Sequence, residues 1–165
     1  MLLNSYQELS RTTAIYPNVE TNLHYPTLGL VDEIGEFDEA IGIMNRQKEA
    51  GDVMWYVAQL ATTIGVNLQD IYLSSIQYDA LEQESLFQLA AKICGRIKKV
   101  ERDYEGVVPE KIKDLLVEYL AKIICVLEYF LVEEESDLST VLQLNLDKLF
   151  DRKKRNVLKG DGDNR

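Results

Sequence analysis

The chain has 165 residues, of which 46% are apolar, and its formal net charge is −10 at pH 7. That length suits one domain with a real core, and the apolar content argues against disorder. The negative charge argues against a protein that coats nucleic acid, because such proteins neutralise phosphates with cations. No apolar run reaches the roughly 18 residues of a membrane span. The start, MLLNSYQELSR, lacks the basic head and apolar core of a signal peptide.

Helical patterns fill the first half of the chain. Residues 3–14 predict a first helix and residues 15–25 a connecting loop. The second helix is predicted from Pro26, at the first position where its missing N–H costs nothing, to about Gly42. A third helix follows to about Ile64 with Asn45 as its N-cap, and a fourth runs from the N-cap Asn67 to Tyr78.

Apolar residues at three- and four-residue spacing mark the helix faces that we expect in the core. They are Leu30, Ile34, Phe37 and Ile41 on the second helix, and Val53, Val57, Leu60 and Ile64 on the third.

Residues 80–133 predict two long helices joined by a turn at 106–109. Their predicted apolar faces are Leu86, Leu89, Ile93, Ile97 and Val100 on the first, and Ile112, Leu116, Tyr119, Ile123, Leu127 and Phe130 on the second. A final helix is predicted over 138–158, followed by a short polar tail. Cys94 and Cys125 lie in apolar helical settings, so we interpret them as reduced core residues of a cytoplasmic protein.

The 80–133 pair looks like a degenerate internal repeat of the preceding pair. The segment DVMWYVAQL, from Asp52, compares with LLVEYLAKI, from Leu115, so that Tyr56 matches Tyr119. One hypothesis is an internal duplication with one catalytic and one structural half. A generic apolar pattern in unrelated helices gives the same similarity, and hairpins that fail to superpose would refute the duplication.

Two acidic pairs stand at helical spacing on either side of the predicted second turn. Glu33 and Glu36 are three residues apart, as are Glu49 and Asp52, and residues so spaced share a helix face. An antiparallel hairpin would bring all four together. Carboxylates that close repel one another, and a hard divalent cation, most often Mg²⁺ where phosphates are handled, is the usual compensation. The plainer interpretation is four solvated surface charges.

Three neighbouring acids are treated differently. Asp32 and Asp38 are predicted to point elsewhere on the helix and are excluded from this set. Glu39, one turn further on, is a candidate extra ligand, and a surface position is its plainer interpretation.

The two acidic pairs resemble a motif of the MazG-like nucleotide pyrophosphohydrolases. The motif reads E-x-x-E, then twelve residues, then E-x-x-D, and here it is set in GLVDEIGEFDEA and KEAGDVMWYVAQLA. The series NLDKLFDRKKR from Asn145, followed by KGDGDNR from Lys159, is similar to that family's last helix and C-terminus. The resemblance covers roughly residues 5–72 and 138–165. It implies an all-α helical bundle, one domain over residues 1–165, in which 80–133 is an inserted helical hairpin.

The resemblance also implies a function. The protein would be a Mg²⁺-dependent nucleoside triphosphate pyrophosphohydrolase, with Mn²⁺ as a substitute, that cleaves between the α and β phosphates. Glu33, Glu36, Glu49 and Asp52 would hold the metal, and Glu36 or Glu33 would orient or deprotonate the attacking water. A house-cleaning role in the cytoplasm and a homodimer or homotetramer are implied as well, without a stable nucleic-acid partner.

The substrate-binding residues are predicted on the last helix and beside the acids. Asn145, Lys148, Arg152 and Arg155 recur on one side of the helix, and matching positions in the family contact metal or phosphate. Cations near a helix C-terminus also favour its dipole, which is the plainer interpretation. Trp55 is the candidate base contact, and Tyr16, Tyr25 and Tyr56 could stack as well, although most such aromatics pack in cores.

Other functions stay open. The substrate range could be narrow (dUTP, dCTP or phosphoribosyl-ATP), or the chain could be a regulatory module that binds nucleotide without cleaving it. A di-iron centre is disfavoured because such bundles use Glu-x-x-His, and the single histidine, His24, stands outside that motif. The acidic tail at 161–164 is too short for a calcium loop.

Overall fold

The computed structural model describes residues 2–160, and every regular element among them is helical. The tail at 161–165, including part of the segment that resembles the family's C-terminus, lies outside the described residues. The all-α class expected from the sequence is confirmed. The helices are α1 (Leu3–Arg11), α2 (His24–Glu39), α3 (Ile43–Thr63), α4 (Leu68–Ser75), the 3₁₀ turn η1 (Ala80–Glu82), α5 (Leu86–Tyr104), α6 (Glu110–Glu133) and α7 (Leu138–Lys154).

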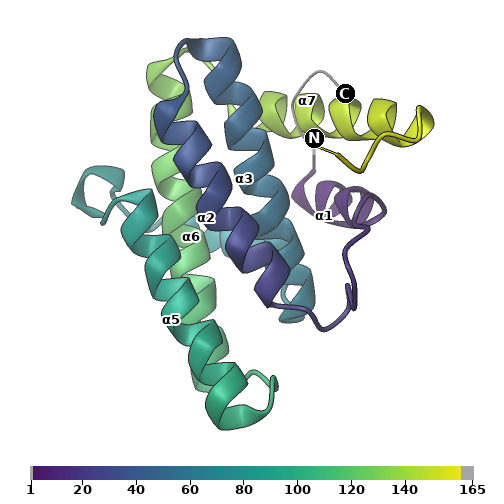
Figure 1. The fold of residues 1–165 in the computed structure, drawn as a ribbon. Coiled ribbons are helices and arrows are strands. Elements are labelled where there is room, and N and C mark those ends of the chain that lie inside the picture. The colour runs from purple at the N-terminus through teal and green to yellow at the C-terminus, as the bar shows by residue number, and fades with distance from the viewer. Residues whose placement is uncertain (1, 161–165) are drawn as a thin grey trace.

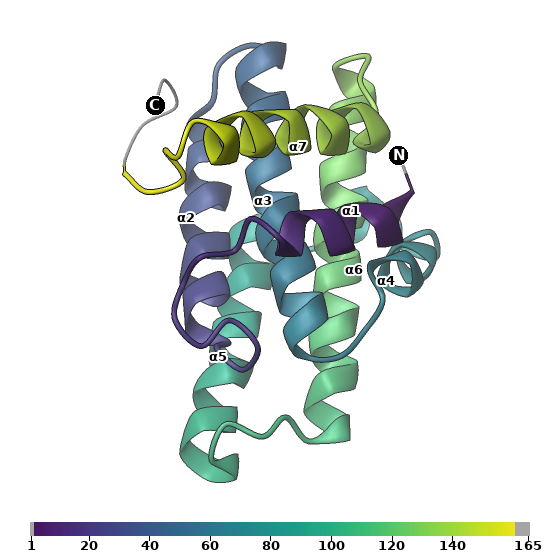
Figure 2. The same ribbon diagram turned by 90° about the vertical axis from the view of Figure 1, so that its right-hand side faces the viewer.

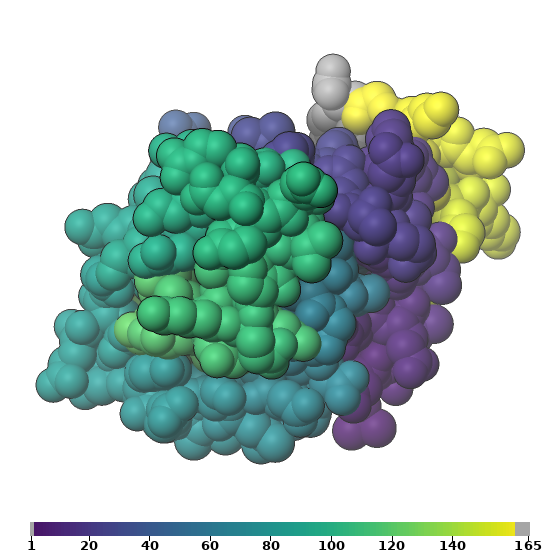
Figure 3. Space-filling model, turned by 90° about the horizontal axis from the view of Figure 1, so that it is seen from below, coloured from purple at the N-terminus to yellow at the C-terminus, as the bar shows by residue number. Residues whose placement is uncertain are grey.

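Four long helices, α2, α3, α5 and α6, stand side by side as an upright bundle, and α1 and α7 lie on one side of it (Figure 1). In the view turned by 90° about the vertical axis, α1 and α7 cross the bundle over α3 (Figure 2). From below, the α5–α6 end and the α1–α7 layer occupy opposite sides of the molecule (Figure 3). One continuous apolar core joins the two helical pairs, with fully buried residues such as Leu30, Val57, Ile93 and Ile123. No helix in the described range is long and apolar enough to cross a membrane.

The predicted turn between the second and third helices is real, but its capping differs from the prediction. The N-cap of α3 is Gly42, whose φ of 84° is a conformation that glycine adopts without strain. This reverses the chain early, so α3 begins before Asn45, and the prediction of Asn45 as the cap was wrong. Asn45 instead donates to the carbonyl of Ile41. Ile41 lies beyond the end of α2 and is 86% exposed, so its predicted core position was also wrong.

Several other helix ends differ by a few residues. The second helix begins at His24, which places Pro26 third in the helix, where an N–H is still not required. Asn67 stands at the N-cap of α4 but makes no side-chain cap bond. The first helix ends at Arg11 and the last at Lys154, three and four residues earlier than predicted.

The predicted pair at 80–133 is present as α5 and α6, and the predicted apolar face of α5 is buried along its length. Phe130, near the end of α6, reaches the surface and packs edge-on against Phe37. Cys94 and Cys125 are free and half-buried.

Candidate functional site

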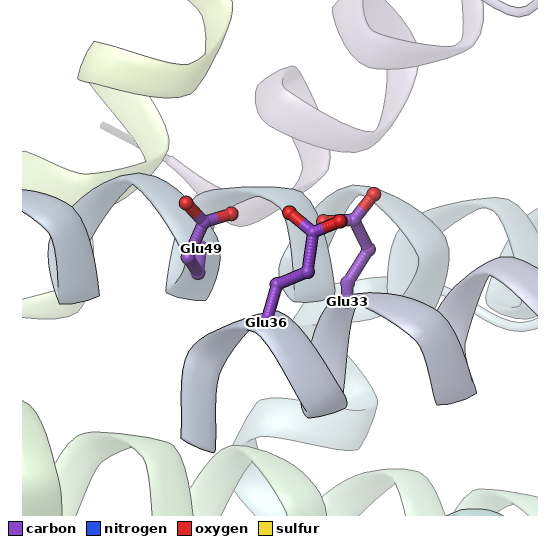
Figure 4. A group of neighbouring side chains, drawn as sticks. All are labelled: Glu33, Glu36 and Glu49. Atoms are coloured by element: carbon purple, nitrogen blue, oxygen red, sulfur yellow. The ribbon is translucent and has the colours of Figure 1, made fainter. Parts of the chain in front are cut away.

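Three glutamates from the α2–α3 hairpin meet at one point. Glu33 and Glu36 come from α2 and Glu49 from the facing turn of α3, and their side chains point into one space (Figure 4). One carboxylate oxygen from each lies within 4.8 Å of the others. Glu49 is buried, Glu33 half-buried and Glu36 exposed, so the cluster runs from the interior to the surface.

Burial and mutual repulsion make this cluster costly in its charged form. The pKa of Glu33 is raised to about 8, first by loss of solvent and then by the charges of Asp52, Glu36 and Glu49, with Lys148 opposing them. Oxygen ligands at this spacing, with negative charge in excess, suit a hard divalent cation. The residues present therefore fit Mg²⁺.

Asp52, expected as the fourth ligand, is held by α7 instead of joining the three glutamates. Its Oδ1 accepts a hydrogen bond of 2.8 Å from Asn145 Nδ2, and its Oδ2 pairs with Lys148 Nζ. Asp52 lies near enough to Glu33 for its charge to act on that carboxyl group, as the hairpin predicts. Asn145 and Lys148, predicted to bind metal or phosphate, contact Asp52 directly.

Close packing of α7 against α3 depends on Gly51. A Cβ built on Gly51 would lie 2.9 Å from Asn145 Cβ, so any larger residue would push α7 away. Tyr6, fully buried on α1, donates to Asn145 Oδ1 at 2.8 Å. Sequence analysis missed Tyr6, because a single aromatic on a short helix carries no motif.

A pocket of about 450 Å³ opens beside the cluster, and Glu33, Glu36 and Asp52 line its acidic side. Asp32, one turn before Glu36, lines the pocket as well, but it does not join the three glutamates, in agreement with its exclusion from the predicted metal-binding set. Glu39 is exposed at the end of α2, as expected, and Asp38 is exposed too.

Four aromatic rings line the other side of the pocket. Tyr16 and Tyr25 stack with their ring centroids 4.4 Å apart, and Trp55 meets the Tyr56 ring edge-on at 4.8 Å. Trp55 Nε1 donates to Thr13 Oγ1 at 3.0 Å. The four aromatics named from the sequence therefore come together as one wall, which we call the aromatic wall.

Gly29 and Arg11 support two rings of the aromatic wall, those of Tyr56 and Tyr16. Gly29 lies under the Tyr56 ring, and a Cβ there would fall 2.2 Å from the ring. Arg11, which sequence analysis missed, donates to the Tyr16 hydroxyl at 3.0 Å and to Gln59 Oε1 at 3.1 Å. It also donates to the carbonyl of Val19, which ties the loop after α1 to the bundle.

The two predicted arginines of α7 have different surroundings. Arg152 is buried, 6% exposed, and lines the pocket. Arg155 is exposed, pairs with Asp151 at 2.7 Å and does not border the pocket. Arg155 is the C-cap of α7, and its side chain is directed to Asp151, one turn before it.

The fold and the site define an all-α protein with a carboxylate cluster beside an aromatic pocket. The chain is 38% identical over 76 residues to the Gene 37 protein of Mycobacterium phage L5, an alignment that covers 46% of this chain and 67% of the phage protein. The chain belongs to the same family as that phage protein. No family model matches the chain. No solved structure matches it either. The name of the phage protein states no activity.

Proposed function

We propose that this protein is a Mg²⁺-dependent nucleoside triphosphate pyrophosphohydrolase of the MazG-like type, which cleaves (d)NTPs between the α and β phosphates. The observation that carries the proposal is the meeting of Glu33, Glu36 and Glu49 within 4.8 Å at the edge of a pocket with an aromatic wall. The pKa of Glu33 is raised to about 8 because too little positive charge lies near these carboxylates. A bound divalent cation would supply that charge.

The three glutamates would hold the metal, with Asp52 beside them. Mg²⁺ there would offset the charge of the triphosphate and lower the pKa of a water molecule. Mn²⁺ would substitute, since it takes the same oxygen ligands. Glu36 or Glu33 would orient the attacking water and accept its proton. Glu36 suits this role because it is the exposed member at the pocket.

The rest of the pocket would bind the substrate. Arg152, buried at the pocket, would make paired contacts with phosphate oxygens, and Lys148 would add a point charge beside Asp52. The aromatic wall would stack on the base, with Trp55 as the central ring. A role for Arg155 would require it to leave Asp151.

The proposal includes a homodimer or homotetramer and a house-cleaning role in the cytoplasm. Light scattering of the purified protein measures the first, and the range of nucleotides hydrolysed bears on the second.

The test is pyrophosphate release from a panel of NTPs and dNTPs with Mg²⁺, measured through a coupled pyrophosphatase. The panel includes dUTP, dCTP and phosphoribosyl-ATP, because a narrow substrate range is the main alternative within enzymes. Glu36→Gln should lower turnover at least about 100-fold, the usual scale for loss of a general base, with the helical circular dichroism unchanged. Glu39→Gln, one turn further along and exposed, is the matched control and should retain full activity.

Full activity in Glu36→Gln would overturn the assignment. Nucleotide binding without cleavage, read as a change in the fluorescence of the single tryptophan Trp55, would favour the non-catalytic regulatory module instead.

A further inference from the structure

Tyr6 on α1 does not line the pocket, yet its hydroxyl ends a chain of hydrogen bonds that leads to Asp52. The Tyr6 hydroxyl donates to Asn145 Oδ1 at 2.8 Å, and Asn145 Nδ2 donates to Asp52 Oδ1 at 2.8 Å. Three helices, α1, α7 and α3, each contribute one residue to this chain.

The orientation of the Asn145 amide decides whether it can hold Asp52. An amide has one accepting and one donating end, and a carboxylate requires the donating end. The Tyr6 hydroxyl donates to the accepting end, and this bond supports the orientation in which Nδ2 faces Asp52. The flipped amide would place its oxygen against the carboxylate.

Solvent cannot take over this task. Tyr6 is fully buried and Asn145 is 3% exposed. Gly51 packs against Asn145 so tightly that a Cβ would lie 2.9 Å away, which leaves no room for a water molecule on that side. Removing the hydroxyl would therefore leave Asn145 Oδ1 without this donor in a closed environment.

We propose that Tyr6 is a positioning residue that acts through Asn145 to hold Asp52 beside the glutamate cluster, and so sets the affinity of the cluster for divalent cations. This inference rests on the proposed function, since it assumes that the cluster binds a cation. Asp52 lines the same pocket as Glu33 and Glu36, so its position affects the negative charge that a cation meets there. Outer partners of metal sites change affinity or activity by about 10- to 100-fold when they are removed.

The experiment measures Mg²⁺ and Mn²⁺ binding to the full chain by titration calorimetry without nucleotide. Tyr6→Phe should weaken cation binding about 10-fold. The turnover of this variant should be below that of the wild type at limiting Mg²⁺ and equal to it at saturating Mg²⁺. A general loss of structure would not be corrected by adding the cation. Tyr72→Phe is the matched control: it removes a hydroxyl that bonds Glu128, between α4 and α6, and should leave cation affinity unchanged.

A double-mutant cycle identifies the route of the effect. If Tyr6 acts through Asp52, Tyr6→Phe should cost little further affinity in an Asp52→Asn background, because residues in one hydrogen-bond network are not additive. Additive losses, or wild-type affinity in Tyr6→Phe, would overturn the inference and leave the proposed function standing. A wild-type protein that neither binds the cations nor cleaves nucleotides would overturn both.

Discussion

Glu33 is the residue at which burial and charge conflict most. Its carboxyl group is half-buried, two more glutamates lie against it, and Asp52 adds a further negative charge. Lys148 is the cation that opposes them in this balance, and it is paired with Asp52. The folded protein therefore keeps a proton on Glu33 that an ordinary glutamate would release.

This conflict makes stability depend on pH. The pKa of Glu33 is about 8 in the folded protein and near its ordinary value of 4.5 when unfolded, so the folded state binds the extra proton between these values. Without divalent cations, the contribution of Glu33 to the free energy of unfolding is full below about pH 4.5. It is lost as the pH rises through about 8. Denaturant titrations at a series of pH values measure it.

Comparison with Glu33→Gln isolates this group from other carboxyl groups with raised pKa values, such as Glu128. The variant should be less sensitive to pH than the wild type over this interval, and Glu39→Gln should behave as the wild type. Equal slopes for wild type and Glu33→Gln would contradict the argument.

At the scale of helices, two glycines set how closely the walls of the site approach. Gly51 lets α7 pack on α3, and Gly29 lets the Tyr56 ring lie over α2. Both positions would bring an added Cβ within 3 Å of a side chain whose place in the site depends on that packing.

Gly51→Ala should destabilise the protein by about 1–3 kcal/mol, the usual cost of overpacking. It should also weaken cation binding, because Asn145 would be displaced from Asp52. Gly95→Ala, in the middle of α5 with nothing near the added Cβ, is the control, and it should stabilise by up to about 1 kcal/mol since alanine is the better helix former. Urea denaturation of both variants checks the pair, and equal effects of the two substitutions would rule out this packing role for Gly51.

The helices and their buried faces could be predicted because periodicity reports which residues a helix turns inward. The α5 face from Leu86 to Val100 is an example. Helix ends could not, because they depend on backbone conformation at single residues. Gly42 caps α3 at positive φ, although Asn45 has the more favourable side chain for a cap.

The meeting of Glu33, Glu36 and Glu49 could also be predicted, because these residues lie on facing turns of two consecutive helices. The bonds that hold Asp52 on α7 instead could not, because spacing within the hairpin does not report them. Tyr6 and Arg11 could not, since their roles arise from contacts between segments distant in sequence. That Asp32 borders the pocket could not be predicted either, because helical spacing does not report how wide a pocket is. The metal, the substrate and the MazG-like assignment remain predictions.

For the molecule as a whole, a net charge of −10 combined with a glutamate cluster predicts that divalent cations stabilise the fold. A ligand that binds only the folded state adds about 2.7 kcal/mol at one hundred times its Kd. The thermal midpoint should therefore rise with Mg²⁺, beyond the rise produced by NaCl at equal ionic strength. Glu49→Gln should keep the salt response and lose the Mg²⁺-specific part, and a Mg²⁺ effect that survives this change would place the cation elsewhere.

The bonds around Asp52 join parts of the chain that are synthesised far apart in time. Lys148 is 96 residues from Asp52, and Asn145 is 139 residues from Tyr6. Contacts with such separations require large loops to close before they form. A nascent chain that has folded its α2–α3 hairpin on the ribosome thus carries Asp52 and the glutamates before Asn145 and Lys148 are present. The bonds to Asp52 form only after α7 emerges.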